Sequence, residues 1–113
     1  MPPDLGGAVV ARILETEALR SSWENELEAM RVRINELRRQ LAAALRLKLN
    51  DGRFDFLADQ KGMFSLLGID AGQVESLMRD HGVYMPASGR INMAGLNASA
   101  IEPVAAAIAA VCR

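Results

Sequence analysis

The chain has 113 residues, of which 50% are apolar and 24% are charged, and its formal net charge is −1. This length suffices for one domain with a modest core, and the near-neutral charge argues against non-specific nucleic-acid binding. The single cysteine, Cys112, excludes an internal disulfide and, with one histidine, a conventional zinc site. No apolar run is long enough to cross a membrane, and the first residues lack the features of a secretory signal, so a cytoplasmic location is expected.

The N-terminal half is predicted to be helical. Residues 2–7 are rich in proline and glycine and predict an irregular start, and residues 8–14 predict one or two helical turns. Residues 17–49 predict one long helix, because apolar side chains recur every three or four positions without an interrupting proline or glycine. The apolar stripe consists of Leu19, Trp23, Leu27, Met30, Ile34, Leu37, Leu41 and Leu45. Charged residues, Arg38 among them, lie between the stripe positions.

Two uses of this long helix are compatible with its pattern. The alternation by three and four is also that of a coiled-coil seam, which would make the helix a dimer interface. The apolar segments that follow the helix need a cover, however, and this favours packing of the stripe on a sheet. The sequence Asn-Asp-Gly at residues 50–52 is a strong helix stop.

The second half of the chain is predicted to mix short strands with helices. Residues 54–57, 63–68, 83–85 and 90–94 are strand candidates. Asp70 and Gln73 have capping-box spacing at the start of a helix that ends at residues 81–82, and Ser99 and Glu102 have the same spacing before a last helix that ends at residue 111. The order predicts an α+β fold, with a long N-terminal helix and two further helices packed on a small β-sheet.

An arginine follows a glycine at the start of one strand candidate. The run Ser-Gly-Arg-Ile-Asn-Met-Ala-Gly at residues 88–95 predicts a tight turn that leads into a strand. Arg90 thereby offers a rigid fork of donors that matches a carboxylate. With Gly-Val-Tyr-Met-Pro-Ala before it, this run resembles the C-terminal signature of class I aminotransferases, the pyridoxal-phosphate-dependent aspartate and aromatic amino-acid aminotransferases. In that family the arginine binds the α-carboxylate of the amino-acid substrate, and the resemblance assigns this role to Arg90.

Three further blocks extend the resemblance over nearly the whole chain. They are Pro-Pro-Asp-Leu-Gly at residues 2–6, Leu-Arg-x-x-Trp-x-x-Glu-Leu at 19–27 and Gln-x-Gly-Met-Phe-Ser at 60–65. In the family the phenylalanine of the last block lines the substrate pocket, which makes Phe64 the second substrate-binding candidate. The first block departs from the family, because Leu5 stands where a histidine is usual and Met1 where an asparagine is usual.

The resemblance also implies what this chain leaves to the rest of its parent. The family binds pyridoxal phosphate through a lysine in a Ser-x-Ser-Lys run, whereas the two lysines here, Lys48 and Lys61, have no such context. Residues 1–16 are therefore expected to form an inter-domain turn and short helix, and residues 17–113 a C-terminal small domain that closes over substrate. The chain would begin about where the large, cofactor-binding domain ends, with no catalytic, cofactor-binding or metal-binding residue of its own, and alone it would be inactive.

The parent implied by the resemblance is a homodimer that uses pyridoxal phosphate to move an amino group between an amino acid and a 2-oxo acid. Aromatic and dicarboxylic substrates both remain open. The alternative is a non-catalytic α+β interaction module that self-associates through the long helix. Of the other polar candidates, Tyr84 is expected to be a half-buried strand residue and Cys112 an inert thiol.

Overall fold

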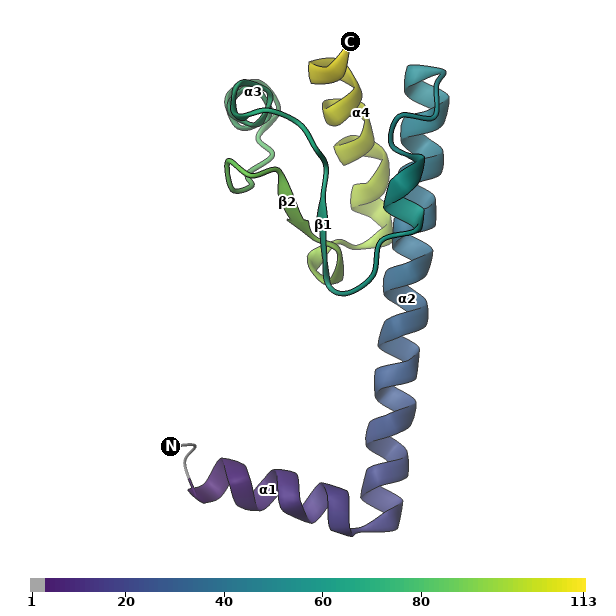
Figure 1. Ribbon diagram of the computed structural model, residues 1–113, viewed down its shortest axis with the longest axis vertical. Helices are drawn as coiled ribbons and strands as arrows, with labels where there is room; N and C mark the ends of the chain where they lie inside the picture. The colour runs from purple at the N-terminus through teal and green to yellow at the C-terminus, as the bar shows by residue number, and fades with distance from the viewer. Residues whose placement is uncertain (1–3) are drawn as a thin grey trace. The chain divides into compact units, whose positions relative to one another are not determined.

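The computed structural model describes residues 4–113. Its helices are α1 (Asp4–Glu15), α2 (Glu17–Leu49), α3 (Ala71–His81) and α4 (Ile101–Cys112), and its strands are β1 (Phe64–Leu66) and β2 (Arg90–Asn92) (Figure 1). Three single 3₁₀ turns, η1 (Asp55–Ala58), η2 (Met93–Gly95) and η3 (Ala98–Ala100), complete the fold. The predicted α+β class is confirmed. Within the described range no helix is both long and apolar enough to span a bilayer.

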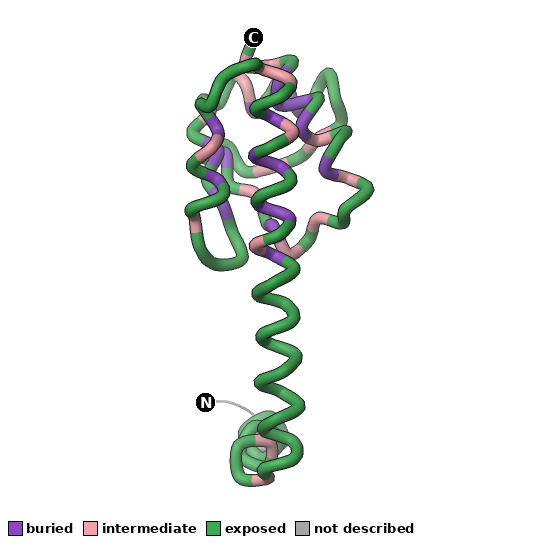
Figure 2. Tube along the Cα trace, turned by 90° about the vertical axis from the view of Figure 1, so that its right-hand side faces the viewer, coloured by how far each residue is buried: buried purple, intermediate pink, exposed green. Residues whose placement is uncertain are grey.

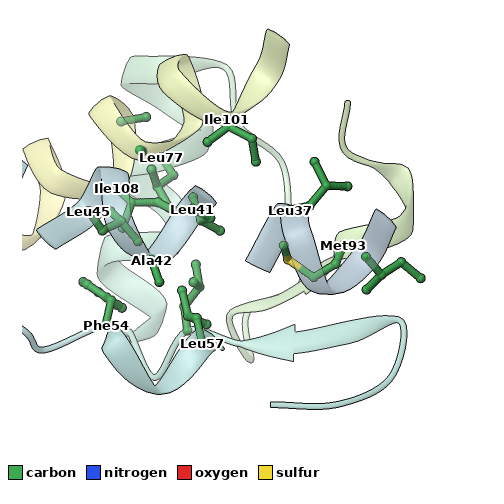
Figure 3. Close-up of a cluster of buried hydrophobic side chains, with 14 residues drawn as sticks. Leu37, Leu41, Ala42, Leu45, Phe54, Leu57, Leu77, Met93, Ile101 and Ile108 are labelled. Carbon is green, nitrogen blue, oxygen red and sulfur yellow. The ribbon is translucent and has the colours of Figure 1, made fainter. Parts of the chain in front are cut away.

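The chain divides into two compact units, Met1–Val32 and Arg33–Arg113. The hydrophobic core lies in the second unit, where α4 runs beside the C-terminal part of α2 (Figure 1). Side chains from α2, α3, α4, η2 and the loop after α2 meet in this core, and those labelled in Figure 3 are Leu37, Leu41, Ala42, Leu45, Phe54, Leu57, Leu77, Met93, Ile101 and Ile108. Burial of this apolar area, at about 25 cal/mol per Å², is what holds the unit together.

The predicted stripe of α2 is divided between the two units. Its residues from Ile34 to Leu45 are buried, as the sequence predicts. Its first four members, in contrast, are between 41% and 49% exposed, and Figure 2 shows the whole first part of α2 as exposed; these four are Leu19, Trp23, Leu27 and Met30. Packing of the complete stripe on the sheet was therefore a wrong expectation for the first half of the helix.

The sheet has two antiparallel strands, with Phe64 opposite Asn92, Ser65 opposite Ile91 and Leu66 opposite Arg90. Strands were predicted at residues 63–68 and 90–94, and both are shorter than predicted. The Leu67 amide still donates to the Gly89 carbonyl at 3.0 Å and the Met93 amide to the Met63 carbonyl at 2.7 Å, so single bonds continue the pairing at each end. Beyond Asn92 the chain turns into η2, because the Asn92 side chain accepts from the Ala94 amide at 3.0 Å.

The strand predicted at residues 54–57 is a 3₁₀ turn instead. Phe54 and Leu57 are both buried, while Phe56 is 38% exposed. A strand would place Phe54 and Phe56 on one face, whereas a turn of three residues places Phe54 above Leu57. The Leu57 amide donates to the Phe54 carbonyl at 3.1 Å, the bond that defines such a turn.

Residues 83–85 do not join the sheet, although a strand was predicted there. The Val83 amide donates to the Leu77 carbonyl at 3.0 Å and so completes the end of α3. Gly82 supports this helix end with a left-handed backbone, at φ +67°. Pro86 has no amide to offer a neighbouring strand, and the segment forms no regular element and has no partner in the described sheet.

Helix α1 is longer than the one or two turns expected, and Gly6 and Gly7 belong to it rather than to an irregular start. A glycine in a helix interior costs only about 1 kcal/mol relative to alanine, which a favourable helix can tolerate. In the first unit the apolar side chains of Val10, Ile13 and Leu14 on α1 gather with Trp23 around one hollow. Residues 1–3, with the prolines of the first family block, lie outside the described residues.

One of the two predicted capping boxes is present. The Asp70 carboxylate accepts from the Gln73 amide at 2.8 Å, and the Gln73 side chain accepts from the Asp70 amide at 3.0 Å. The box predicted for Ser99 and Glu102 is wrong, because Asn97 takes the role of cap. Its side chain accepts from the Ala100 amide at 3.0 Å and forms turn η3, and α4 begins only after that turn.

Candidate functional site

Arg90 and Phe64 lie side by side on the exposed face of the sheet. The Arg90 guanidinium carbon is 4.7 Å from the centre of the Phe64 ring, within the range of a cation–π contact. The pairing register explains this contact, because Arg90 is opposite Leu66 and Phe64 is its diagonal neighbour on the same face. The structure thus brings together the two predicted substrate-binding residues, which are 26 positions apart in the sequence (90 − 64).

The turn before β2 sets where Arg90 leaves the sheet. The Gly89 amide donates to the Pro86 carbonyl at 2.9 Å, and Gly89 has a φ of +76°. A side chain is disfavoured at this φ, and a β-carbon there would also lie 3.4 Å from Ile69. The positive φ therefore favours glycine here, whereas the distance to Ile69 is that of an ordinary van der Waals contact.

The donors of Arg90 are not used by neighbouring carboxylates. Within the part of the chain that the structure describes, no ion pair and no side-chain hydrogen bond involves Arg90. By contrast, Arg31 and Arg39 on α2 are paired with Glu28 and Glu36. A guanidinium that rests on an aromatic ring keeps its edge available, and that edge is where a planar carboxylate binds with two parallel hydrogen bonds.

A hollow of about 370 Å³ lies next to this pair. Its lining is mostly apolar and comes from β1, the segment after α3, β2 and the chain beyond it: Phe64, Val83, Tyr84, Met85, Pro86, Arg90, Ile91, Asn92, Gly95, Leu96 and Val104. An apolar wall with one cationic edge is the arrangement that fits an organic acid. Tyr84 is 76% exposed here rather than half-buried as expected, because residues 83–85 join no strand.

A second arginine, Arg38, lies beneath the sheet, and the sequence interpretation missed it. Its side chain is completely buried, although it had been grouped with the charged residues between the stripe positions. It donates to the Gly62 carbonyl, to the Phe64 carbonyl at 3.0 Å and to the hydroxyl of Ser65, which is 2% exposed. Burial lowers the pKa of Arg38, since removal from water disfavours the charged form.

The two lysines do not fit the role of a cofactor-binding lysine. Lys48 forms an ion pair with Glu102, and Lys61 is exposed in the turn before β1. Neither lines the hollow beside Arg90. Within residues 4–113 there is also no cluster of three metal-ligating side chains. The residues of this chain therefore do not by themselves fit pyridoxal phosphate.

Cys112 lies apart from the Arg90 hollow, at the end of α4. Burial raises the pKa of its thiol, an effect larger than the opposing influence of Arg53. A thiol with a raised pKa is a poor nucleophile at neutral pH. The expected inertness of Cys112 stays a prediction.

Fold and site together define a small α+β domain that presents an exposed arginine over an aromatic ring. Residues 2–108 match the family model described as aminotransferase class I and II, and the chain belongs to that family. It is 46% identical over 110 residues to the aromatic-amino-acid aminotransferase of Escherichia coli and 44% identical over 110 residues to the aspartate aminotransferase of the same organism. Each alignment covers 97% of this chain and 28% of the relative.

Solved aminotransferases have the same fold in the matching region. An aromatic amino acid aminotransferase with 3-indolebutyric acid superimposes with a TM-score of 0.93 at 43% identity, over 98% of this chain and 28% of that one. The aromatic-amino-acid aminotransferase of Burkholderia pseudomallei, covalently bound to pyridoxal phosphate, gives a TM-score of 0.93 at 42% identity, over 99% of this chain and 28% of that one. The chain thus spans little more than a quarter of the length of the relatives it matches.

Proposed function

We propose that this chain is the C-terminal small domain of an aromatic or aspartate-type aminotransferase, with residues 17–113 as the domain proper. The whole protein would transfer an amino group between an amino acid and a 2-oxo acid. Arg90 would bind the substrate α-carboxylate and Phe64 would form the adjoining wall of the pocket. The observation that carries this proposal is the Arg90 guanidinium, which lies over Phe64 beside an apolar hollow with no carboxylate paired to it in the described chain.

The energy available from this arrangement is appropriate for substrate recognition. A charge-assisted hydrogen-bonded pair between guanidinium and carboxylate contributes about 1.5–3 kcal/mol. At about 1.4 kcal/mol for each factor of ten, this corresponds to roughly a 10- to 140-fold effect on affinity. Because Arg90 is held on a short strand of a separate small domain, binding of the carboxylate would also draw that domain toward the substrate and exclude water.

The cofactor would be held by parts of the protein outside this chain. Pyridoxal phosphate supplies the electron sink for amino-group transfer when it is bound. Lys48 and Lys61 are not placed for it, so this chain's contribution is to bind and orient the substrate. On this proposal the domain alone does not catalyse transamination.

The proposed role is tested by a graft. Residues 2–108 of this chain replace the matching segment of the Escherichia coli aromatic-amino-acid aminotransferase, and transamination of phenylalanine and of aspartate is measured. We expect activity in the graft, and a 10- to 140-fold lower kcat/KM for both amino acids after Arg90→Leu, by the estimate above. Arg79→Leu is the matched control, since Arg79 is exposed on α3 and paired with Asp80. Equal losses in the two variants would refute the assignment.

A second experiment examines the chain by itself. The purified chain is mixed with pyridoxal phosphate and reduced with borohydride, and adducts are located by mass spectrometry. We expect no stoichiometric adduct on a lysine and no turnover of phenylalanine or aspartate. A single stoichiometric adduct on Lys48 or Lys61 together with turnover would show that the chain is an enzyme in its own right.

Self-association is a second candidate function, and one observation favours it. The first four stripe residues of α2 remain between 41% and 49% exposed, an apolar series of the kind that protein partners cover: Leu19, Trp23, Leu27 and Met30. The homodimer of the proposed parent and a free-standing interaction module would both use such a surface. Sedimentation equilibrium of the chain and of its Trp23→Ser variant decides whether it supports a dimer, with Leu47→Ser, at a residue 84% exposed, as control.

A further inference from the structure

We propose that the buried Arg38 is a positioning residue for the substrate-binding pair: it fixes the backbone of β1 from below, and thereby sets where Phe64 and Arg90 meet on the exposed face. This inference rests on the proposed function of Arg90 and names a residue of the same site that does not itself touch substrate. The two arginines would have different roles: Arg90 would donate to the substrate, and Arg38 donates to the backbone of the strand and of the turn before it.

The pairing pattern shows why β1 needs support from a side chain. Met63 and Leu67, two residues before and after Ser65, bond the backbone of Met93 and Gly89, the residues that flank β2. In an antiparallel pair, the intervening residues turn their backbone groups away from the partner strand. Phe64 and Leu66 therefore present theirs at the outer edge of the sheet, where a two-stranded sheet has no further strand.

Side chains occupy that outer edge. Arg38 donates to the Phe64 carbonyl at 3.0 Å. Gln60 bonds both backbone groups of Leu66, accepting from its amide and donating to its carbonyl, each at 3.3 Å. Together these two side chains bond three of the four backbone groups that a third strand would otherwise pair, namely the Phe64 carbonyl and both groups of Leu66.

Arg38 is the residue that connects this edge to the site. It binds the carbonyl of Phe64 itself, the carbonyl of Gly62 two residues before and the hydroxyl of Ser65 one residue after. Because successive side chains point to opposite faces of a strand, Ser65 turns toward Arg38 while the Phe64 ring turns toward Arg90. Three acceptors on four consecutive residues fix both the position and the rotation of the strand.

The environment of Arg38 indicates a role that a neutral residue would not fill. A buried charge is unfavourable unless it is fully bonded, yet no carboxylate is paired with Arg38 in the described chain, and its Nε has no partner. Oxygens that are not charged, two carbonyls and one hydroxyl, take the place of a counter-ion. An apolar side chain could fill the same volume, but it could not hold three acceptors in a fixed geometry.

The test reads the geometry of the folded state directly, by NMR on the isotopically labelled 113-residue chain. Protons at the end of Arg90 lie near the face of the Phe64 ring, so they should resonate upfield, and Phe64→Leu gives the reference without the ring. We expect Arg38→Met to remove most of this ring-current shift. Arg39→Met is the matched control and should leave the shift unchanged, because Arg39 is the next residue on α2, is exposed and pairs with Glu36.

Two milder variants keep the test decisive if Arg38→Met does not fold. Ser65→Ala removes one acceptor of Arg38 and should reduce the ring-current shift of Arg90 in part. Arg38→Lys keeps the charge but loses the planar guanidinium donors, so it should not give the wild-type shift. A chain that stays folded with an unchanged Arg90 shift in Ser65→Ala or Arg38→Met would overturn the proposal. A wild-type ring-current shift in Arg38→Lys would also overturn the proposal, because a positive charge without the guanidinium geometry would then be sufficient.

A second measurement on the chain tests the carboxylate-binding role of Arg90 independently of the role of Arg38. The same samples are titrated with 3-indolepropionate, an aryl carboxylate. Wild-type binding that Arg90→Met abolishes, and that Arg38→Met weakens, supports both proposals. A wild-type chain with the ring-current shift but without Arg90-dependent binding refutes the carboxylate role of Arg90, while the effect of Arg38→Met on the shift still decides whether Arg38 positions the pair.

Discussion

The contact between Arg90 and Phe64 makes a quantitative prediction for stability. The distance of 4.7 Å between the guanidinium carbon and the ring centre is well within cation–π range, and the Phe64 side is 46% exposed. For an exposed pair such a contact contributes about 0.5–1 kcal/mol, and about 2 kcal/mol only when it is desolvated. We therefore expect a coupling energy of about 0.5–1 kcal/mol between Phe64→Leu and Arg90→Met.

The measurement is a double-mutant cycle by urea unfolding of the chain, the two single variants and the double variant. A cycle with Phe64→Tyr in place of Phe64→Leu should give a coupling energy near zero, because tyrosine keeps the aromatic face and so does not remove the contact with Arg90. Pairing Phe64→Leu with Arg79→Met, on α3, should give additive effects, since Arg79 pairs with Asp80. A coupling below about 0.3 kcal/mol, which is within the usual error of additivity, would show that the two residues do not stabilise each other.

Three further predictions concern turns, a helix cap and the partly buried thiol of Cys112. Gly89→Ala and Gly82→Ala should each lower the free energy of unfolding by about 1–2 kcal/mol in urea titrations, because both have positive φ; no effect at Gly89 would contradict the tight turn. Asn97→Ala should lower it by about 1 kcal/mol and Ser99→Ala by clearly less, since Asn97 is the cap that bonds the Ala100 amide. Because burial raises its pKa, Cys112 should react with iodoacetamide at pH 7 more slowly than glutathione does, and a faster reaction would contradict its burial.

Features that depend on neighbouring residues could be predicted from the sequence. The capping box of Asp70 and Gln73, the helix stop at residues 50–52 and the turn before Arg90 are each made by residues within a few positions. The contact between Arg90 and Phe64 is not local and was not predicted, although the family resemblance assigned both residues to substrate binding. Nothing in the spacing of the two segments gives the register that makes them diagonal neighbours.

The wrong strand predictions have a common physical cause. Residues 54–57 and 83–85 have the composition of strands, but a strand forms only where another backbone supplies its hydrogen bonds. The Val83 amide is already used by the end of α3, and the Leu57 amide bonds back to Phe54. In both segments a short-range bond competes successfully for the group that a sheet would need, and propensity alone does not show that competition.

Arg38 shows that a signal for a buried arginine was present in the pattern and was not used. On a helix, residues three and four apart are neighbours, and most arginines of α2 have a glutamate at such a position, as Arg31 has Glu28 and Arg39 has Glu36. The corresponding neighbours of Arg38 hold no carboxylate and three of the four are apolar: Ile34, Asn35, Leu41 and Ala42. Arg38 is also four residues after Ile34 and next to Leu37, so it belongs to the buried face itself.

An arginine on an apolar helix face without a local counter-ion needs acceptors from another part of the chain. Exposed carboxylates are excluded from a dry interface, so backbone carbonyls at the unpaired edge of a short sheet are the acceptors most able to meet it there. Such an arginine therefore points to a strand edge packed against its helix. In this chain it would have indicated that β1 lies over α2 at Arg38, and hence that the outward face of β1, with Phe64, is fixed enough to help form a binding site.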